Sequence, residues 1–187
     1  MNSISRFQQI LKAVPRAAFE QIVQRHQGDR YVKKFFCWDQ LVAMMYVQLA
    51  GAASLRQLQA GFNANPRGHH HLNARCVARS TLADANEKRN PLIFAELLQA
   101  LITQAGRSIR HQRQELLYLL DATTVDLPPR GCESLRGHAS AHGNHGVKLH
   151  VLFESHSAVV SHVSITPAKI NDITEARKLP IQAGATY

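Results

Sequence analysis

The hydrophobic period changes once along this chain, just after Gly106, and that change constrains the fold more than any other feature. Before it, apolar residues recur every three or four positions, as in amphipathic helices. After it, they form short continuous runs typical of strands, at residues 116–120, 147–153 and 159–165. We therefore expect an α+β chain with a helical domain over residues 1–106 and a domain of three strands and a closing helix over 107–187.

Turn and cap residues divide the helical part into short helices. Residues 63–78 are rich in Asn, Gly, Pro and His and predict a loop. Thr81 and Asp84 have the spacing of a loose capping box. The remaining signals are breaks at Pro15, Gly28, Gly51 and Gly106, and side-chain caps at Ser54, Asn90 and Asn171.

The positive charge is concentrated in the first half. Residues 1–90 hold 13 Lys and Arg against 5 Asp and Glu, a net +8, and residues 91–187 hold 9 against 8, a net +1; together these give the +9 of the chain. Such asymmetry favours a polyanion-binding module joined to a neutral one. The alternative is a basic surface that serves only solubility.

The cysteines and the apolar runs indicate the compartment. Three cysteines, Cys37, Cys76 and Cys132, lie far apart without a CxxC pair, which argues against a disulfide framework. No apolar run is long enough to cross a bilayer, and the amino terminus lacks the apolar core of a secretory signal. We expect a soluble, cytoplasmic protein associated with the nucleoid, with no membrane partner and no small-molecule substrate.

A helix-turn-helix pattern is the candidate DNA-binding motif, with a supporting helix at 54–58 and a recognition helix at 79–89. The intervening loop is longer than in the compact motif, so an ordinary face of a helical bundle is the alternative. The recognition helix offers side chains for phosphates and base edges, namely Arg79, Ser80, Thr81, Asn86, Lys88 and Arg89.

Asp121 is a candidate ligand-binding acid, because it directly follows the apolar run 116–120, which predicts a strand buried on both faces. Ligands gather at the carboxyl ends of such strands, although a turn residue is an equal alternative. Lys148 and His150 alternate on the next strand and face the same side, toward either phosphate or solvent. Asp172 fits the electrostatics of a helix start. The spacings of Cys132, His138, His142 and His145 do not match a structural zinc site.

Three segments of the second half, 119–124, 146–150 and 166–172, resemble the start of the catalytic domain of DDE transposases of the insertion-sequence-four type. In the first half, 28–30, 36–40, 54–56 and 80–86 resemble the helical domain that accompanies those enzymes in bacteria. The resemblance implies a ribonuclease-H-like fold, incomplete in this chain, behind a DNA-binding domain. It also implies three acids that hold Mg²⁺ or Mn²⁺, of which Asp121 matches the first.

The resemblance further implies that Lys148 and His150 lie near the site, on phosphate. In the family the second Asp follows a stretch like 183–187, so the second Asp and the Glu are expected beyond Tyr187. The first strand would then lie between the second strand and a missing fourth, with one edge bare. We expect a transposase fragment that binds transposon-end duplex DNA but lacks a complete catalytic triad, with a homodimer left open. A non-catalytic DNA-binding regulator of transposition is the alternative.

Overall fold

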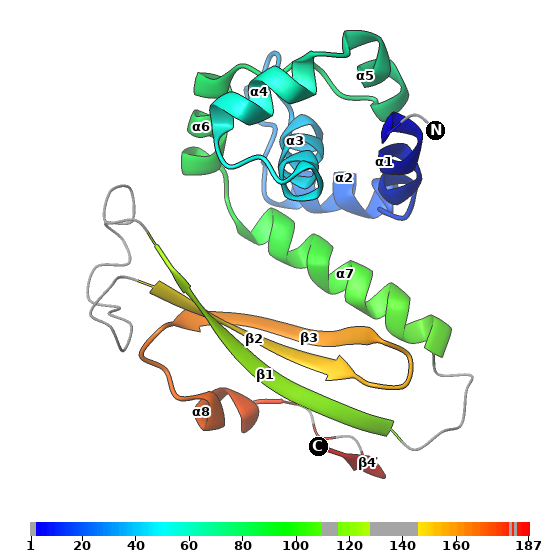
Figure 1. Cartoon of the computed structure of the whole chain (residues 1–187), viewed down its shortest axis with the longest axis vertical. Coiled ribbons are helices and arrows are strands. Elements are labelled where there is room, and N and C mark those ends of the chain that lie inside the picture. Colours follow the sequence, from blue (N-terminus) through cyan, green and yellow to red (C-terminus); the bar gives the residue numbers. More distant parts are fainter. Residues whose placement is uncertain (1–2, 110–115, 128–145, 180, 182) are drawn as a thin grey trace. The chain divides into compact units, whose positions relative to one another are not determined.

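The computed structural model describes residues 3–109, 116–127, 146–179, 181 and 183–187. These residues form two compact units, residues 1–101 and 102–187 (Figure 1). The first unit is built from helices, and the second contains all the strands described. The chain is thus a mixture of helix and sheet, as the sequence predicted. No helix among the described residues is long and apolar enough to span a membrane.

Seven helices occupy the first half of the described chain. They are α1 (Ser3–Lys12), α2 (Arg16–Arg25), α3 (Cys37–Ala50), α4 (Leu55–Asn63), α5 (Pro66–Leu72), α6 (Arg79–Lys88) and α7 (Leu92–Ile109). Helix α3 is the most apolar of the short ones, and its first seven residues are buried, so that it lies at the centre of the helical unit (Figure 1). The other helices pack their apolar faces around it, because a helix is stabilised mainly by burying one side.

The core of the helical unit is continuous. Its largest fully buried side chains are Phe19, Cys37, Val42, Leu58, Val77, Leu82 and Ile93. Gly28 lies against this core: a Cβ at this position would come within 2.5 Å of the Ile93 Cδ1 atom and 2.8 Å of the Cys37 sulfur. A larger residue at 28 would therefore have to displace the core, which explains a glycine just after α2.

Most of the predicted helix boundaries are confirmed. Gly51 closes α3 in the left-handed conformation (φ 63°), and Ser54 caps α4 by accepting a hydrogen bond from the Gln57 amide at 3.2 Å. Asn90 accepts from the Leu92 amide at 3.0 Å. Asn171 caps the closing helix in the same way.

Three local predictions are wrong. The segment 63–78 is not a loop throughout, because helix α5 forms within it. The expected capping box of Thr81 and Asp84 does not form, since α6 begins at Arg79 after an uncapped Ala78. Gly106 does not end its helix: α7 continues to Ile109, and a glycine costs a helix only about 1 kcal/mol.

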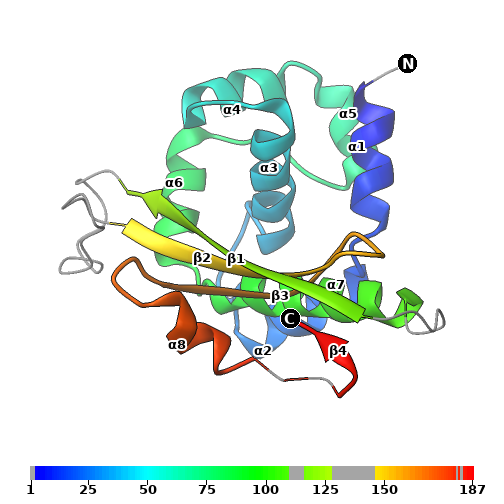
Figure 2. The same ribbon diagram turned by 60° about the horizontal axis from the view of Figure 1, so that its bottom comes forward.

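The second unit contains a four-stranded sheet in the order β3-β2-β1-β4. Its strands are β1 (Leu116–Asp126), β2 (Gly146–Glu154), β3 (Val159–Pro167) and β4 (Ala185–Thr186), with α8 (Asp172–Ala176) between β3 and β4. The first three strands form an antiparallel meander, whereas β4 runs parallel to β1. Figure 2 shows β4 beside the start of β1. Strands β2 and β3 confirm the two predicted apolar strands.

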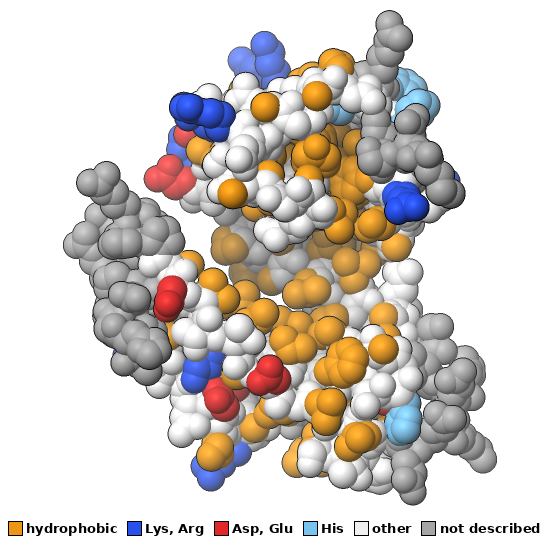
Figure 3. All heavy atoms as spheres, in the orientation of Figure 1, with side chains coloured by type: hydrophobic (Ala, Val, Ile, Leu, Met, Phe, Trp, Pro, Cys, Tyr) orange, Lys and Arg blue, Asp and Glu red, His pale blue; other side chains and the backbone are white. Residues whose placement is uncertain are grey.

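Two expectations about β1 need correction. Its edge is not wholly bare, because β4 pairs Ala185 with Leu116 and Thr186 with Leu117. Nor is the apolar run covered on both faces, since Leu119 is 51% exposed and Leu120 is 40% exposed. Hydrophobic side chains are correspondingly visible over the sheet unit in Figure 3. A continuous apolar run is thus compatible with a partly open sheet.

Candidate functional site

Asp121 lies in the middle of β1 and not at its end, since the strand continues through the β-branched Thr123, Thr124 and Val125 to Asp126. In the antiparallel ladder Asp121 is paired with Val151 of β2. Its side chain is exposed, and no hydrogen bond or ion pair to it occurs within the described residues. The structure therefore offers a carboxylate whose oxygens are available to a ligand, held on a regular strand.

Lys148 and His150 lie on the other face of the sheet. Residues paired across a ladder share a face, and successive residues alternate between faces. Asp121 shares its face with Val151, whereas Ala122 and Thr124 pair with His150 and Lys148. The expectation that these two basic residues lie beside Asp121 is therefore not supported by the register.

Lys148 and His150 instead hold the segment that begins α8. The Lys148 Nζ donates to the Ile170 carbonyl and to Asp172 Oδ1, both at 2.9 Å. His150 is 2% exposed, with Nε2 at 2.9 Å from the Thr166 hydroxyl and Nδ1 at 3.7 Å from Asp172 Oδ1. Asp172, expected only to suit a helix start, thus joins α8 to two residues of β2.

Glu175 completes this polar layer under α8. It is buried, and it accepts hydrogen bonds from Lys178 and from the Ser164 hydroxyl. The hydrogen bond from Lys178 is the main cause that lowers the pKa of the Glu175 carboxyl, against the opposing effect of burial. The ionised carboxylate is therefore satisfied inside the fold and is not free for a metal.

The described residues do not by themselves form a metal centre. No group of three or more His, Cys, Asp or Glu side chains within them is arranged to hold an ion. Mg²⁺ needs at least one or two carboxylates together with waters or phosphate oxygens. Asp121 offers one carboxylate, so it fits as one member of such a site and not as the whole of it.

Helix α6 presents five of the six predicted DNA contacts at the surface. Arg79, Ser80, Thr81, Asn86 and Lys88 are exposed, while Leu82 and Ala85 anchor the opposite side of the helix in the core. The side chains of this exposed face are free to meet a groove or a phosphate chain. The helix predicted over 79–89 is therefore present and presents polar groups outward.

The side chains of Asn86 and Arg89 are engaged by other residues of the helical unit, although Asn86 is exposed. Asn86 accepts a hydrogen bond from the Gln40 side-chain amide at 2.7 Å. Arg89 is only 9% exposed and donates to Gln40 Oε1 at 2.9 Å and to the carbonyls of Phe35 and Phe36. Both side chains are thus engaged in joining α6 and its end to α3, and we leave them out of the DNA surface proposed below.

One residue of the neighbouring helix was missed. Arg56 of α4 and Arg79 of α6 line the same open groove, of about 460 Å³, with Gln59, Ala60 and Asn63 between them. The Gln59 side chain accepts from the Arg79 amide at 2.9 Å, which holds the two helices in this arrangement. The sequence carried a signal for Arg56 in its place just after the Ser54 cap, on the predicted supporting helix.

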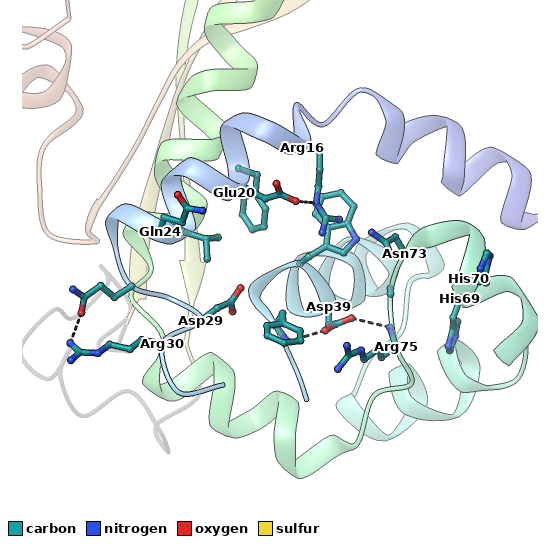
Figure 4. A pocket seen from close by; sticks show the side chains of 16 residues that line it. Arg16, Glu20, Gln24, Asp29, Arg30, Asp39, His69, His70, Asn73 and Arg75 are labelled. Carbon is teal, nitrogen blue, oxygen red and sulfur yellow. Dashed lines mark hydrogen bonds and ion pairs between the residues drawn. The ribbon is translucent and has the colours of Figure 1, made fainter. Parts of the chain in front are cut away.

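A larger cleft of the helical unit lies between α2, the start of α3 and residues 69–75 (Figure 4). It has a volume of about 960 Å³. Its three acids are all paired: Glu20 with Arg16 at 2.7 Å, Asp29 with the Cys37 amide at 2.7 Å, and Asp39 with the amides of Phe36 and Arg75. The Arg16 guanidinium also covers the Trp38 ring, 3.9 Å from its centroid. These pairings make the three acids of the cleft poor candidates for acid–base or metal chemistry.

The His-rich segment that contains Cys132, His138, His142 and His145 lies outside the described residues. The suggestion of zinc there, which the spacings did not favour, is therefore not tested by the structure.

Comparison with known proteins gives two family matches. Residues 2–74 match a family described as "Domain of unknown function (DUF4372)". Residues 112–183 match the family described as "Transposase DDE domain". The second match includes Asp121, β2, β3 and α8. The first ends just before the segment that leads into α6.

One curated relative is similar to the chain. It is named "Putative transposase y4zB", from Sinorhizobium fredii, and is 36% identical over 107 residues, which are 57% of this chain and 29% of the relative. This chain therefore spans well under two thirds of the length of that relative. No solved structure matches the chain. The DDE-domain match and the transposase relative agree with each other: residues 112–183 are similar to the transposase DDE domain, and more than half of the chain is similar to a protein named as a putative transposase.

Proposed function

We propose that this chain binds the duplex DNA of transposon ends through its helical unit and contributes Asp121 to a strand-cleaving centre, in a transposase of the insertion-sequence-four type. The single observation that supports this best is the register of β4 on β1, taken together with the match to the transposase DDE domain. In this chain β1 lies between β2 and β4, as expected for the ribonuclease-H-like fold that the family implies.

The register indicates where a second acid would lie. Leu117 pairs with Thr186, so each residue further along β1 is matched by one further along β4. The Tyr118 and Tyr187 rings stack with centroids 5.2 Å apart, which agrees with this register. In a longer protein whose β4 continued in register, the third residue after Tyr187 would lie beside Asp121. A carboxylate at that place would make an acid pair on neighbouring parallel strands.

Members of the DDE transposase family generally use divalent metal ions. Bound to such an acid pair, Mg²⁺ or Mn²⁺ would supply a Lewis acid near the scissile phosphate. Asp121 would be one ligand, and Thr123, two residues along the same strand face, could orient it or meet phosphate. Because Asp121 is one of the three acids that the family implies, and one acid cannot build a two-metal centre, we expect no strand cleavage from residues 1–187 alone.

The DNA surface that we propose comprises the exposed α6 side chains Arg79, Ser80, Thr81 and Lys88, together with Arg56 across the groove from Arg79. Two cations on a common groove suit a run of phosphates, and the hydroxyls suit phosphate or base edges. Lys148 and His150 are not part of this surface, because their contacts lie under α8.

Fluorescence anisotropy with a labelled duplex from a transposon end tests the DNA surface. The double variant Arg79→Ala/Lys88→Ala should bind roughly 10-fold or more weakly and lower the slope of log K against log salt by about 1.8, because each lost phosphate contact removes about 0.9. Lys12→Ala/Lys169→Ala removes the same charge from exposed sites elsewhere. If the two double variants lost the same DNA affinity, the effect would depend only on the net charge of the protein, and the assigned surface would be refuted.

A nuclease assay separates the transposase from the alternative, a regulator that occupies transposon ends without cutting. It requires a longer protein in which the chain continues past Tyr187. With Mg²⁺, that protein should nick a transposon end, and Asp121→Asn should abolish nicking while leaving the DNA affinity and the melting temperature unchanged, because the side chain is exposed and unpaired within the described residues. DNA binding without any nicking would favour the regulator. Nicking that survives Asp121→Asn would refute the role of this residue.

A further inference from the structure

A cysteine and a histidine that belong to neither proposed surface form a contacting pair in the helical unit. The Cys76 sulfur lies 3.5 Å from His69 Nδ1. His69 belongs to α5, and Cys76 to the segment that joins α5 to α6. Cys76 is exposed, whereas His69 is only 6% exposed. The pair therefore combines a thiol that solvent can reach with an imidazole held inside the fold.

The surroundings of His69 fix which nitrogen carries its proton. His69 Nε2 lies 2.7 Å from the Phe62 carbonyl oxygen, which can only accept, so Nε2 bears hydrogen. In the neutral ring, Nδ1 is then the basic nitrogen, and it faces the Cys76 sulfur. The ring also stacks on Phe62, with centroids 4.4 Å apart and an interplanar angle of 21°. Orientation and tautomer are thus both set for Nδ1 to take the thiol proton.

The protonated form of this histidine would be as well satisfied as the neutral one. After proton transfer, Nε2–H still donates to the Phe62 carbonyl and Nδ1–H donates to the thiolate. The face of the Phe62 ring also favours a cation stacked on it.

The backbone on both sides of the thiol is anchored. The Arg75 amide donates to Asp39 Oδ1 at 2.9 Å, and the Val77 amide donates to Asn63 Oδ1 at 2.9 Å. The Asn63 side-chain amide returns a bond to the Val77 carbonyl at 2.8 Å. Cys76 is therefore held in place beside His69 by its immediate neighbours, which is the arrangement expected of a nucleophile with its base.

We propose that Cys76 is a nucleophilic thiol activated by His69 and is a site of covalent modification by small electrophiles, including hydrogen peroxide. With peroxide, His69 takes the thiol proton and the thiolate sulfur attacks one oxygen. An S–O bond forms as the O–O bond breaks, and the leaving hydroxide takes the proton from His69 as water, which leaves a sulfenic acid. This inference does not depend on DNA binding or strand cleavage.

Cys37 provides an internal reference of the opposite kind. It is fully buried in the core, and burial is the main cause that raises the pKa of its thiol to about 12, with a hydrogen bond to Asp29 adding to the effect. A thiol of this kind is inert while the protein is folded. The same chain thus contains one cysteine that should react and one that should not.

The test is the rate of iodoacetamide labelling at pH 7, measured for each cysteine-containing peptide by mass spectrometry. An ordinary thiol with a pKa near 8.5 is only about 3% thiolate at pH 7, so full activation raises the rate by at most about 30-fold. Because a more stable thiolate is also a weaker nucleophile, we expect Cys76 to react about 10-fold faster in the folded protein than in urea, and Cys37 to remain unlabelled until unfolding.

His69→Gln keeps an amide donor for the Phe62 carbonyl but removes the base, and His70→Gln on the adjacent, exposed residue is the matched control. His69→Gln should lower Cys76 labelling to the rate in urea and abolish dimedone tagging of Cys76 after peroxide, whereas His70→Gln should change neither. An unaltered rate in a folded His69→Gln protein would overturn the proposal. If that variant fails to fold, the wild-type protein still provides a test, through the ratio of Cys76 labelling rates in the folded protein and in urea. A labelling rate in the folded protein that is no higher than the rate in urea would also overturn the proposal.

Discussion

Arg89 provides the clearest test of whether a predicted DNA-contacting residue binds DNA or stabilises the fold. Its sequence context, at the end of a predicted recognition helix, suggests a phosphate contact. Its guanidinium, however, donates to Gln40 Oε1 and to the carbonyls of Phe35 and Phe36, and lies 3.8 Å from Asp29. We predict that Arg89→Ala destabilises the helical unit and weakens DNA binding only through that loss of structure.

The magnitude follows from these contacts. Removing one member of a buried, charged network generally costs about 3–5 kcal/mol, because the remaining groups lose their partner. Asp29 is 29% exposed, so water can reach it, and it keeps the Cys37 amide as a donor. We therefore expect the lower end, about 3 kcal/mol. For a unit of about 100 residues this lowers the melting temperature by roughly 12–24 °C.

The assay is thermal and urea unfolding followed by far-UV circular dichroism, with Arg56→Ala as an exposed control that should stay within about 0.5 kcal/mol of the wild type. Anisotropy below the melting temperature of each variant then compares DNA binding. Arg56→Ala should weaken DNA binding and leave the stability unchanged. Arg89→Ala should lower the stability and leave the DNA affinity of the folded protein unchanged. An Arg89→Ala protein that melts like the wild type but binds DNA more weakly would refute the structural role.

Three further outcomes are expected. Asp39→Ala leaves two backbone amides without their acceptor and should destabilise the helical unit by about 2 kcal/mol in urea unfolding, whereas Asp84→Ala on the surface of α6 should have little effect. Lys148→Met removes two hydrogen bonds and should speed amide exchange in α8 without changing the salt dependence of DNA binding. Hydrogen bonds from Ser157 lower the pKa of Glu154 below its ordinary 4.5. The ionised carboxylate therefore stabilises the fold above pH 4.5, and this contribution is lost as the pH falls through the pKa of Glu154 in the folded protein. The difference in melting temperature between the wild type and Glu154→Gln should consequently become smaller between pH 6 and pH 3.

Local signals were sufficient for much of the fold. Gly51, Ser54 and Asn90 act through atoms only a few residues away, so their effect could be predicted without knowing the tertiary structure. Helix α5 was missed although it begins with Asn65 and Pro66, the same pair of residues that correctly marked the start of α7. Its seven residues are too few to show a helical hydrophobic period, and its three consecutive histidines concealed the pattern.

The site was harder to predict because its key contacts are distant in sequence. Arg89 contacts residues about fifty positions earlier, and nothing in its local sequence distinguishes it from an exposed arginine. Lys148 and His150 were correctly expected to share a face, but which face holds Asp121 depends on the pairing of β1 with β2, and a shift of one residue would reverse it.

The separation of Asp121 from Lys148 and His150 has a consequence for how β2 tolerates mutation. Its even-numbered positions 146, 150, 152 and 154 are buried, and position 148 bonds to the α8 segment, whereas the odd-numbered positions are only half-buried. A saturation library scored for cellular abundance should consequently show depletion of charged substitutions at every second codon along this strand. Selection for transposition would add constraint to the intervening codons, so that stability and activity could be adjusted on alternate residues of a single strand.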